Sequence, residues 1–419
     1  MLLILKKEVL LKRFLLLSYL FLLAITVFSQ QIAEEAVVIN IEVPVRVFQD
    51  GIFIENLSLD DFEILEDGTL QRVEAVYLIK KRSVERSEEK KRYTPTTTRS
   101  FFLFFEISEY TPEIGDTIDY FYENVLSPGD NLIIVTPMKT YKLRNRVMEH
   151  QSKQELSKQL KDLLRNEALI GNAEYRGAVQ ELIGLAKSLS AGGPGDTGKI
   201  SQQLDEYTLP GYGRLPLEKQ LMKYLNTLER IEKLRQLNQQ RLLDFAKVLK
   251  KNDGQKFVFL IYQREFIPQI DPSVLDKYIA QYEDEPHILY GLYDLFETTR
   301  RDISFDVNLV KQTYADSSIS IHFLFLTPPI KPIRGVYFQE RSEDIYGAFK
   351  EMADATGGFI DSSSNAVASF KKAVHASENY YLLYYSPQKY EKDGKFREIV
   401  VRIKEKDYKV VHRQGYFAN

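Results

Sequence analysis

The chain has 419 residues, of which 44% are hydrophobic and 27% charged, enough apolar material for about two or three domains. Lys and Arg total 56 and Asp and Glu total 59, and the resulting net charge of −3 argues against a protein that coats nucleic acid. The absence of cysteine excludes disulfides, thiolate nucleophiles, cysteine-ligated zinc and iron–sulfur clusters.

Residues 1–29 have the pattern of a secretory signal peptide. Basic residues precede an apolar run over 14–28. Val27 and Ser29 occupy the two positions that a signal peptidase recognises, so we expect cleavage before Gln30. Cleavage removes four basic residues and one acidic residue, which moves the net charge from −3 to −6. An uncleaved anchor is the alternative, because flanking residues could extend the run across a bilayer. We therefore expect an exported protein, periplasmic or extracellular, that meets a membrane only through an uncleaved leader.

Residues 30–79 show the two-residue alternation of β-strands. Strand-like runs cover 37–48, 52–54, 62–65 and 73–79, and turn residues such as Asp50-Gly51 separate them. The following residues, 80–98, are first dense in charges of both signs and then lack apolar periodicity. We interpret 80–98 as a charged linker.

Residues 99–377 alternate buried strands with helical patterns. Continuous apolar runs predict strands at 100–107, 131–136, 256–262, 319–326 and 359–361. Helical spacing covers 114–126, 153–165, 174–189, 218–251, 273–282, 307–315, 345–356 and 366–376. This alternation predicts an α/β domain with a mostly parallel central sheet and helices on both faces, interrupted by an insertion at about 190–251.

The last segment, 378–419, returns to β structure. Strand-like runs cover 379–385, 396–403 and 408–412. Because an isolated sheet of two or three strands is only marginally stable, we expect these strands to pack with the amino-terminal ones, with extension of the central sheet as the alternative.

Candidate binding residues follow from the predicted sheet, because ligands of open parallel sheets sit at the carboxyl ends of the strands. Polar and charged side chains occur at three such places: Glu106, Ser108, Glu109 and Tyr110 after the first strand, Asn172 in the loop before the helix at 174, and Gln263, Arg264 and Glu265 after the third strand. The alternative is that these are ordinary solvated loop residues.

Several short segments together resemble one known family. They are LSLDDFEILEDG (57–68), LSPGD (126–130), MADATGGF (352–359), NYYLLYYSP (379–387), KFREIVV (395–401) and RQGYF (413–417). In these segments the chain resembles the bacterial von Willebrand factor A (VWFA)-related proteins. The resemblance implies a Rossmann-like A domain and supports β structure at both ends of the chain.

The same resemblance bears on metal binding. A functional A domain holds Mg²⁺ through a D-x-S-x-S segment, a threonine and a later aspartate. Here Glu106 stands at the first aspartate, Tyr110 replaces the second serine, and Gln263 stands at the later aspartate. Ser108 matches the first serine, and Asn172 or Ala173 falls near the threonine. Since Mg²⁺ demands near-octahedral oxygen ligands at about 2.1 Å, the resemblance implies a degenerate, metal-free site, with residual Mg²⁺ binding as the alternative.

No enzyme motif is present: the chain lacks a G-x-S-x-G elbow, an H-E-x-x-H helix and a phosphate-binding loop. We therefore expect no cofactor and a non-enzymatic interaction or scaffold protein whose partner is another envelope or extracellular protein. The rival hypothesis is an exported hydrolase whose site is assembled from residues distant in the sequence.

Overall fold

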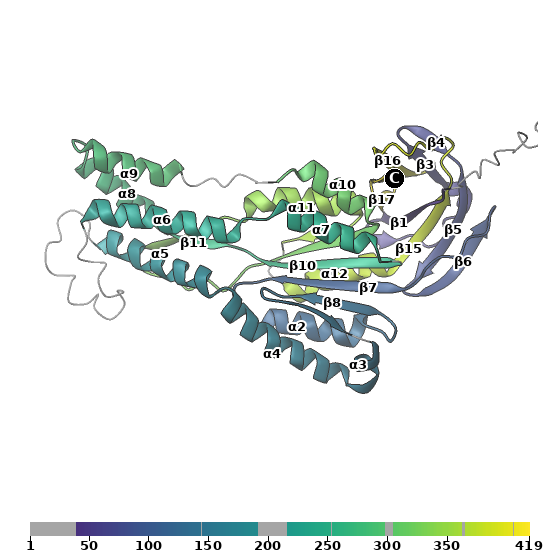
Figure 1. Cartoon of the computed structure of the whole chain (residues 1–419), viewed down its shortest axis with the longest axis horizontal. Coiled ribbons are helices and arrows are strands. Elements are labelled where there is room, and N and C mark those ends of the chain that lie inside the picture. The colour runs from purple at the N-terminus through teal and green to yellow at the C-terminus, as the bar shows by residue number, and fades with distance from the viewer. Residues whose placement is uncertain are drawn as a thin grey trace, which may run out of the picture. The chain divides into compact units, whose positions relative to one another are not determined.

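The computed structural model describes residues 39–143, 145–191, 216–252, 254–297, 305–362, 365–404 and 406–419 (Figure 1). The expected signal peptide, 1–29, lies outside these residues, as does the part of the expected insertion over 192–215. Within the described ranges, no helix combines the length and apolar character needed to cross a membrane.

A six-stranded sheet, with strand order β14-β12-β10-β7-β8-β9, forms the centre of the fold (Figure 1). Its strands are β7 (Arg99–Glu106), β8 (Asn131–Val135), β9 (Thr140–Leu143), β10 (Gln255–Gln263), β12 (Ile319–Leu326) and β14 (Phe359–Asp361). Neighbouring strands run parallel except β9, which is antiparallel to β8. This arrangement confirms the α/β fold class and adds the edge strand β9, which the sequence analysis did not predict.

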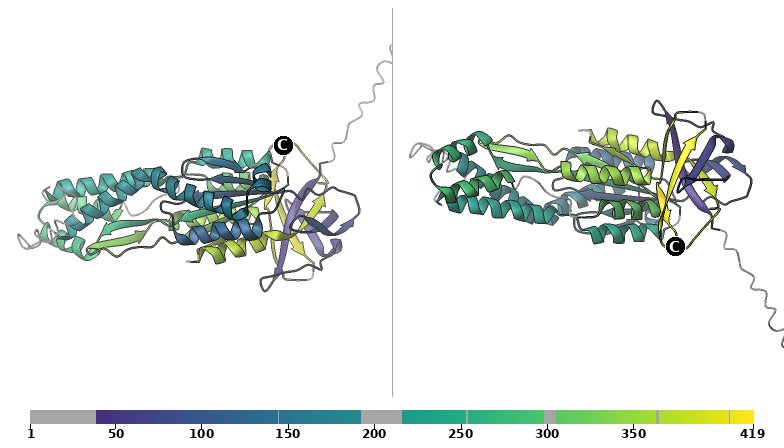
Figure 2. Two further views of the ribbon diagram at one scale, coloured as in Figure 1. Left: turned by 90° about the horizontal axis from the view of Figure 1, so that it is seen from below. Right: turned by 90° about the horizontal axis from the view of Figure 1, so that it is seen from above.

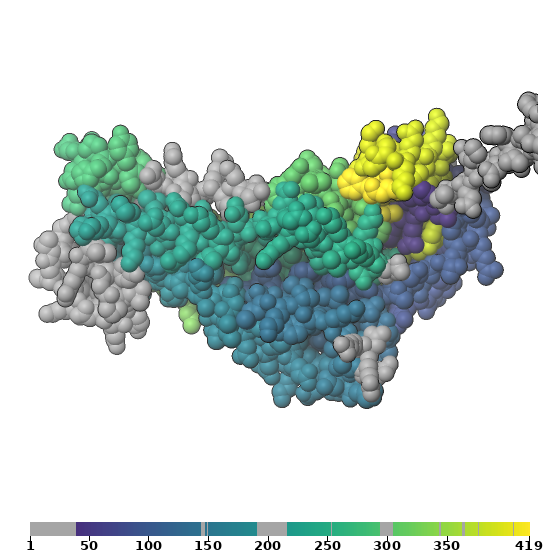
Figure 3. All heavy atoms as spheres, in the orientation of Figure 1, coloured from purple at the N-terminus to yellow at the C-terminus, as the bar shows by residue number. Residues whose placement is uncertain are grey.

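Helices cover both faces of this sheet. One face carries α2 (Pro112–Tyr120), the π-helical turn η2 (Phe121–Val125), α4 (Lys153–Gly171) and α12 (Ala366–Glu378); the other carries α7 (Gln239–Lys250), α10 (Val307–Asp316) and α11 (Glu343–Thr356). In Figure 3 the teal atoms of α7 lie at the surface of the molecule. Strand β7 explains the layering, because Phe101 and Phe105 enter one core and Phe102 enters the other. A short helix, α3 (Asn145–His150), precedes α4.

A third core lies beyond the carboxyl ends of β7 and β10, as the views in Figures 1 and 2 show. We call its elements the helical arm: α5 (Ala173–Ala191), α6 (Leu217–Arg235), α8 (Pro272–Gln281), α9 (Pro286–Glu297), and the antiparallel pair β11 (Phe266–Ile270) and β13 (Val336–Glu340). Leu185, Leu228 and Ile267 are among the side chains that share this core.

The arm corrects two expectations about the insertion. The helix expected over 218–251 is two helices, because the chain leaves the helical conformation after Arg235 and Asn238 starts α7 by accepting a hydrogen bond from the backbone N–H of Arg241. Helix α7 then packs in the core of the central sheet, whereas β11, α8, α9 and β13 join the arm. The inserted structure therefore does not coincide with residues 190–251.

The two ends of the chain form antiparallel sheets, one of which is a curled half-barrel. The first contains β1 (Ile41–Gln49), β2 (Ile52–Phe53), β5 (Val73–Lys80), β6 (Ser83–Glu89), β15 (Asn379–Tyr385) and β17 (Lys409–His412); the second contains β3 (Phe62–Glu66), β4 (Thr69–Gln71), β16 (Phe396–Ile403) and β18 (Gly415–Phe417). A 3₁₀ turn, η1 (Leu59–Asp61), precedes β3. Because β1 pairs with β15 and β17, and β3 pairs with β16, the expected β-rich unit built from both ends is confirmed.

Part of the expected linker is a strand. Residues 83–89 form β6, which pairs with β5 after a turn in which Lys81 adopts a φ of 54°. Strand β6 is an edge strand and most of its side chains are exposed. Because the strand packs no apolar face against the core, charged side chains are tolerated along it. Charges on an edge strand also oppose pairing with another chain.

The β unit contacts the amino ends of the central strands through a buried arginine. The guanidinium of Arg46 donates to the carbonyl of Gly357 at 2.8 Å and to the hydroxyl of Ser320 at 2.9 Å. Desolvation lowers its pKa to about 10, so it keeps its charge at neutral pH. Gly357 ends α11 with a φ of 67°, and the partial negative charge of a helix carboxyl terminus stabilises the buried cation.

Candidate functional site

Gln263, the last residue of β10, closes the space between the carboxyl ends of β7 and β10. Its side-chain oxygen accepts hydrogen bonds from the backbone N–H and the hydroxyl of Ser108 and from the backbone N–H of Glu109, each at 2.9 Å. Its side-chain nitrogen donates to the carbonyl of Glu109 at 3.1 Å. Gln263 is fully buried, so its amide is used within the chain.

This closed space is where the sheet topology would place a ligand. Strand β7 lies between β8, its successor in the sequence, and β10, from which the chain continues outward to β12 and β14. The strand order therefore reverses between β7 and β10, and ligands of open α/β sheets bind at such a reversal. In this protein the Gln263 side chain fills it.

Asn172 belongs to the same cluster. Its side-chain nitrogen donates to the carbonyl of Ile107 at 2.9 Å and to the carbonyl of Ala168 at 3.1 Å. The amide thereby ties the end of α4 to the loop after β7. The structure thus brings together Ser108, Glu109, Asn172 and Gln263, four of the eight residues expected from the sequence.

Glu106 lies near the charged residues Arg235, Arg241 and Glu265 and not in the cluster around Gln263. Desolvation raises its pKa above the ordinary value, and the guanidinium groups of Arg235 and Arg241 act against this shift, although part of the side chain is exposed. Strand alternation explains the separation, because Phe105 and Ile107 enter the core on one face of the sheet and Glu106 points to the opposite face.

Glu265 forms a buried ion pair with Arg235, the last residue of α6. The Arg235 Nε lies 2.9 Å from a carboxylate oxygen of Glu265, and the hydroxyl of Tyr262 donates to the same oxygen. The guanidinium also lies 5.1 Å from the ring centre of Tyr175 and 5.4 Å from that of Tyr262. Burial acts to lower the pKa of Arg235, but Glu265 outweighs it and the pKa is raised. This pair fastens the arm to the end of β10.

Tyr110 and Arg264 belong neither to the cluster around Gln263 nor to the charged residues around Glu265. The guanidinium of Arg165, on α4, lies 4.7 Å from the ring centre of Tyr110, while desolvation raises the pKa of the phenol. Arg264 pairs with Glu340 at 3.1 Å and donates to the carbonyl of Ser362 at 3.2 Å. The sequence analysis missed Arg235 and Glu340, since each lies far along the chain from its partner and no local pattern marks it.

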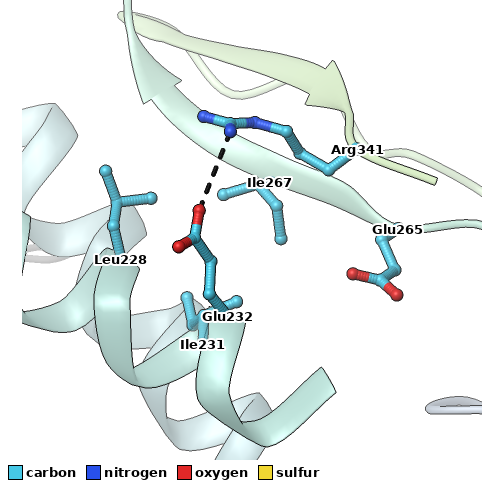
Figure 4. Close-up of a pocket in the computed structure, with 6 residues that line it drawn as sticks. All are labelled: Leu228, Ile231, Glu232, Glu265, Ile267 and Arg341. Atoms are coloured by element: carbon cyan, nitrogen blue, oxygen red, sulfur yellow. Dashed lines mark ion pairs between the residues drawn. The ribbon is translucent and has the colours of Figure 1, made fainter. Parts of the chain in front are cut away.

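A small cavity lies between the arm and the strand ends (Figure 4). It is lined by Leu228, Ile231, Glu232, Glu265, Ile267 and Arg341, and Arg341 pairs with Glu232 across it at 3.9 Å. Its volume of about 20 Å³ holds roughly one water molecule. A ligand larger than water does not fit.

The cluster around Gln263 does not suit a metal cation. Two N–H groups and one O–H group converge on the Gln263 oxygen, whereas Mg²⁺ requires lone pairs directed at it. Across the ranges that the structure describes, no three His, Asp or Glu side chains lie close enough to hold a metal ion.

A buried serine–histidine pair bears on the hydrolase alternative. The hydroxyl of Ser377, on α12, lies 2.9 Å from Nε2 of His322, on β12, and donates to the carbonyl of Ala373 at 2.7 Å. The single hydroxyl proton is thus used, so Nε2–H donates to Ser377 and Nδ1 is an acceptor without a hydrogen-bond partner. Both residues are buried, and no carboxylate orients the imidazole. The pair lacks both the base geometry and the access that a nucleophile needs.

Comparison with known proteins assigns no family. No protein-family model and no curated protein matches the sequence. Among solved structures, the human COPII-coat protein Sec24c aligns over 84% of this chain and 46% of its own chain, with 6% sequence identity and a TM-score of 0.24. The chain thus spans less than half the length of that structure.

Proposed function

We propose that the protein is an exported, non-enzymatic interaction or scaffold protein of the bacterial cell envelope, built on a vWA-like domain that has lost Mg²⁺ binding. The observation that carries this proposal is the Gln263 side chain, which fills the reversal point of a mostly parallel sheet with four internal hydrogen bonds. The segments that resemble VWFA-related proteins lie on both sides of this point in the sequence and support the same interpretation.

The contacts that the described polar groups beside Gln263 and Glu265 make with one another support a binding role over a hydrolytic one. The polar side chains there either form hydrogen bonds with one another, as Ser108 and Gln263 do, or form a buried ion pair, as Arg235 and Glu265 do. A general base needs a reactive proton within hydrogen-bond reach and a space for substrate, and the cavity beside Glu265 holds only about one water.

The partner would meet the exposed residues on this edge rather than the buried ones. Gln263 and Glu265 are buried, whereas Glu109 is exposed. On the same edge, Met138, Leu169 and Ile170 expose 45%, 52% and 61% of their surface. Met138 lies against the end of α4, because a Cβ on Gly171 would stand 3.0 Å from its side chain. Exposed apolar side chains at the end of α4 and in the loop after β8 suit another folded protein of the envelope.

The metal claim is tested by thermal unfolding of the mature chain with millimolar Mg²⁺ or Mn²⁺, followed by chelator. A site that binds only the folded state raises the midpoint in proportion to the logarithm of the metal concentration. We expect no shift. A rise of several degrees that the chelator reverses would show residual metal-dependent adhesion instead.

The interaction claim is tested by affinity purification from envelope extracts with wild type, Ile170→Asp, and a matched control, Val248→Asp. Val248 is exposed to 53% on α7, away from the strand ends. We expect one envelope protein to co-purify with wild type and the control and to be lost with Ile170→Asp. Equal recovery with both variants contradicts the proposed surface. Turnover of an ester, peptide or glycoside panel that Ser377→Ala abolishes would favour the hydrolase.

A further inference from the structure

Three buried polar atoms where the β unit meets the central sheet have no hydrogen-bond partner among the described residues. They are Nε of Arg46 on β1, the hydroxyl oxygen of Tyr380 on β15 and Nδ1 of His322 on β12. We call them the junction atoms. Each of the three residues exposes 2% of its surface or less. Buried polar groups in folded proteins almost always have a partner, either a protein group or an ordered water, so three such atoms at one junction indicate a shared one.

Arg46 and Tyr380 face each other across two neighbouring strands. The antiparallel ladder of β1 and β15 pairs Val45 with Tyr381, and Arg46 and Tyr380 are the next residues along it. Side chains at directly opposed positions share one face of a sheet, with Cβ atoms about 4.5–5.5 Å apart. Desolvation raises the pKa of Tyr380, and the guanidinium of Arg46 is among the charges that act on it. The hydroxyl and the guanidinium therefore share one buried environment.

The Nε–H of Arg46 is directed toward β12. Nε and Nη2 lie on the same edge of the planar guanidinium, and Nη2 donates to the hydroxyl of Ser320 on β12 at 2.9 Å. His322 stands two residues beyond Ser320 in the same strand, so its side chain lies on the same face. Desolvation lowers the pKa of His322 to about 3, and the charge of Arg46 contributes to this shift. The Nε–H and the imidazole thus meet at one face of β12.

The imidazole of His322 is held in one orientation. Its ring stacks on Phe259 with centres 4.9 Å apart and an angle of 18°, and its Nε2 lies 2.9 Å from the hydroxyl of Ser377. Because that hydroxyl already donates to the carbonyl of Ala373, Nε2 carries the proton and Nδ1 carries a lone pair. A cavity of about 10 Å³ is lined in part by Phe259 and Ser377, so the packing beside His322 leaves space of about the size of one water molecule.

The junction atoms offer two donors and one acceptor. The N–H of Arg46 and the O–H of Tyr380 donate, and Nδ1 of His322 accepts. An anion would satisfy both donors but would face the lone pair of Nδ1, and a cation would be repelled by Arg46. A water molecule accepts from both donors and donates to Nδ1, and three hydrogen bonds are the usual number for a buried water. We propose that one ordered water molecule binds the three junction atoms.

The other charged groups that act on Tyr380 are already engaged. Glu42 accepts from the hydroxyl of Tyr384 at 2.8 Å. Arg99 donates to the two carboxylate oxygens of Asp130 at 3.1 and 2.6 Å. These contacts leave the water as the shared partner of the junction atoms.

The water joins the β unit to the central sheet. It links β1 and β15, which come from opposite ends of the chain, to β12 at the centre of the fold. A water-mediated contact is enthalpically nearly as favourable as a direct hydrogen bond. The site therefore acts together with the contacts of Arg46 to Gly357 and Ser320, which attach the same two parts.

The first test is a crystal structure of the mature chain at a resolution that shows ordered waters. We expect one water oxygen within about 2.7–3.2 Å of all three junction atoms. A direct hydrogen bond between two of these atoms, or no density within reach of them, overturns the proposal. A crystal soaked in bromide distinguishes water from an anion, because only bound bromide gives an anomalous signal there. We expect no such signal, and its appearance would show an anion site instead.

The second test uses oxygen-17 relaxation dispersion, which detects long-lived internal waters in solution. Tyr380→Phe deletes one of the three partners with little change in shape, so the water should be lost or should exchange several-fold faster. Tyr290→Phe, at a position on α9 that is 71% exposed, should match wild type. Wild-type dispersion in Tyr380→Phe contradicts the site. The crystal test needs no variant, and neither result depends on the partner surface or on metal binding at Gln263.

Discussion

The side-chain oxygen of Gln263 accepts hydrogen bonds from both the backbone N–H and the hydroxyl of Ser108, although 155 residues separate them in the sequence. Gln263 is the last residue of β10 and Ser108 lies in the loop just after β7, the neighbouring strand, and their contact closes the position where a ligand of this topology would bind. The amide thus acts as an internal ligand and joins the two halves of the α/β layer.

Loss of this amide should destabilise the protein. Gln263→Ala leaves the N–H groups of Ser108 and Glu109 without their acceptor, and we expect the free energy of unfolding to fall by about 2–4 kcal/mol. Gln240→Ala, at an exposed position on α7, should change it by less than about 0.5 kcal/mol. Urea unfolding measures both. Equal stability of the two variants would mean that water replaces the Gln263 amide.

The buried Arg235–Glu265 pair should matter far more than a surface pair on the same helix. Arg235→Ala leaves Glu265 buried without its cation, and we expect a loss of about 3–5 kcal/mol. Arg230→Ala breaks the more exposed pair with Glu181, for which about 1 kcal/mol or less is expected. Urea midpoints compare the two. A double variant, Arg235→Met with Glu265→Leu, should recover much of the loss, because it removes both charges.

His322 should make stability depend on pH. Desolvation, with a further contribution from Arg46, lowers its pKa from 6.5 to about 3. The unfolded chain therefore binds a proton on His322 below pH 6.5, whereas the folded chain does not bind it until about pH 3. The free energy of unfolding thus falls as the pH falls through this window. The loss at pH 5 relative to pH 8 is about 2 kcal/mol from this group.

The readout is the difference in unfolding free energy between pH 8 and pH 5 for wild type and His322→Gln. The variant should lose much of the difference whatever its absolute stability. Burial also lowers the pKa of His412, so part of the slope should remain. An unchanged slope in His322→Gln would show that His322 is not buried in its neutral form.

Replacement by alanine should have opposite effects on stability at two glycines, Gly347 inside α11 and Gly358 just after its end. A Cβ on Gly358 would stand 1.8 Å from the carbonyl oxygen of Ile321, so Gly358→Ala should cost about 3 kcal/mol or more, or prevent folding. A Cβ on Gly347 meets nothing within 4 Å, and Gly347→Ala in the helix interior should stabilise by about 0.5–1 kcal/mol. Thermal unfolding compares the two, and a tolerated Gly358→Ala would contradict the close packing of α11 on β12.

The sequence analysis predicted the layers because buried segments have a recognisable local pattern of apolar residues. The run 100–107 is apolar without alternation, and β7 is buried on both faces, as Phe101 and Phe102 show by entering different cores. Alternation over 37–48 likewise indicated β1. The edge strand β6 lacks such a pattern, because its side chains face solvent and its charges resemble those of a linker.

The candidate site was predicted only in part for the same reason. The rule on strand ends located Ser108, Asn172 and Gln263 correctly on one edge, but it could not separate Glu106 from them. Nor could it pair Arg264 with Glu340, which enters from β13 in the arm. The division of 218–251 into α6 and α7 depends on where each half packs, and helical periodicity continues through the break.

The sequence by itself determined the elements that burial dictates: the central parallel strands, the helices over them, and β structure at both ends of the chain. Only the tertiary structure decided that Gln263 would fill the strand-end site, that Arg235 would be buried against Glu265, and that Glu340 would pair with Arg264. The physical reason is that periodicity records the average environment of neighbouring residues, whereas a hydrogen bond or ion pair depends on how distant segments pack to within a fraction of an ångström.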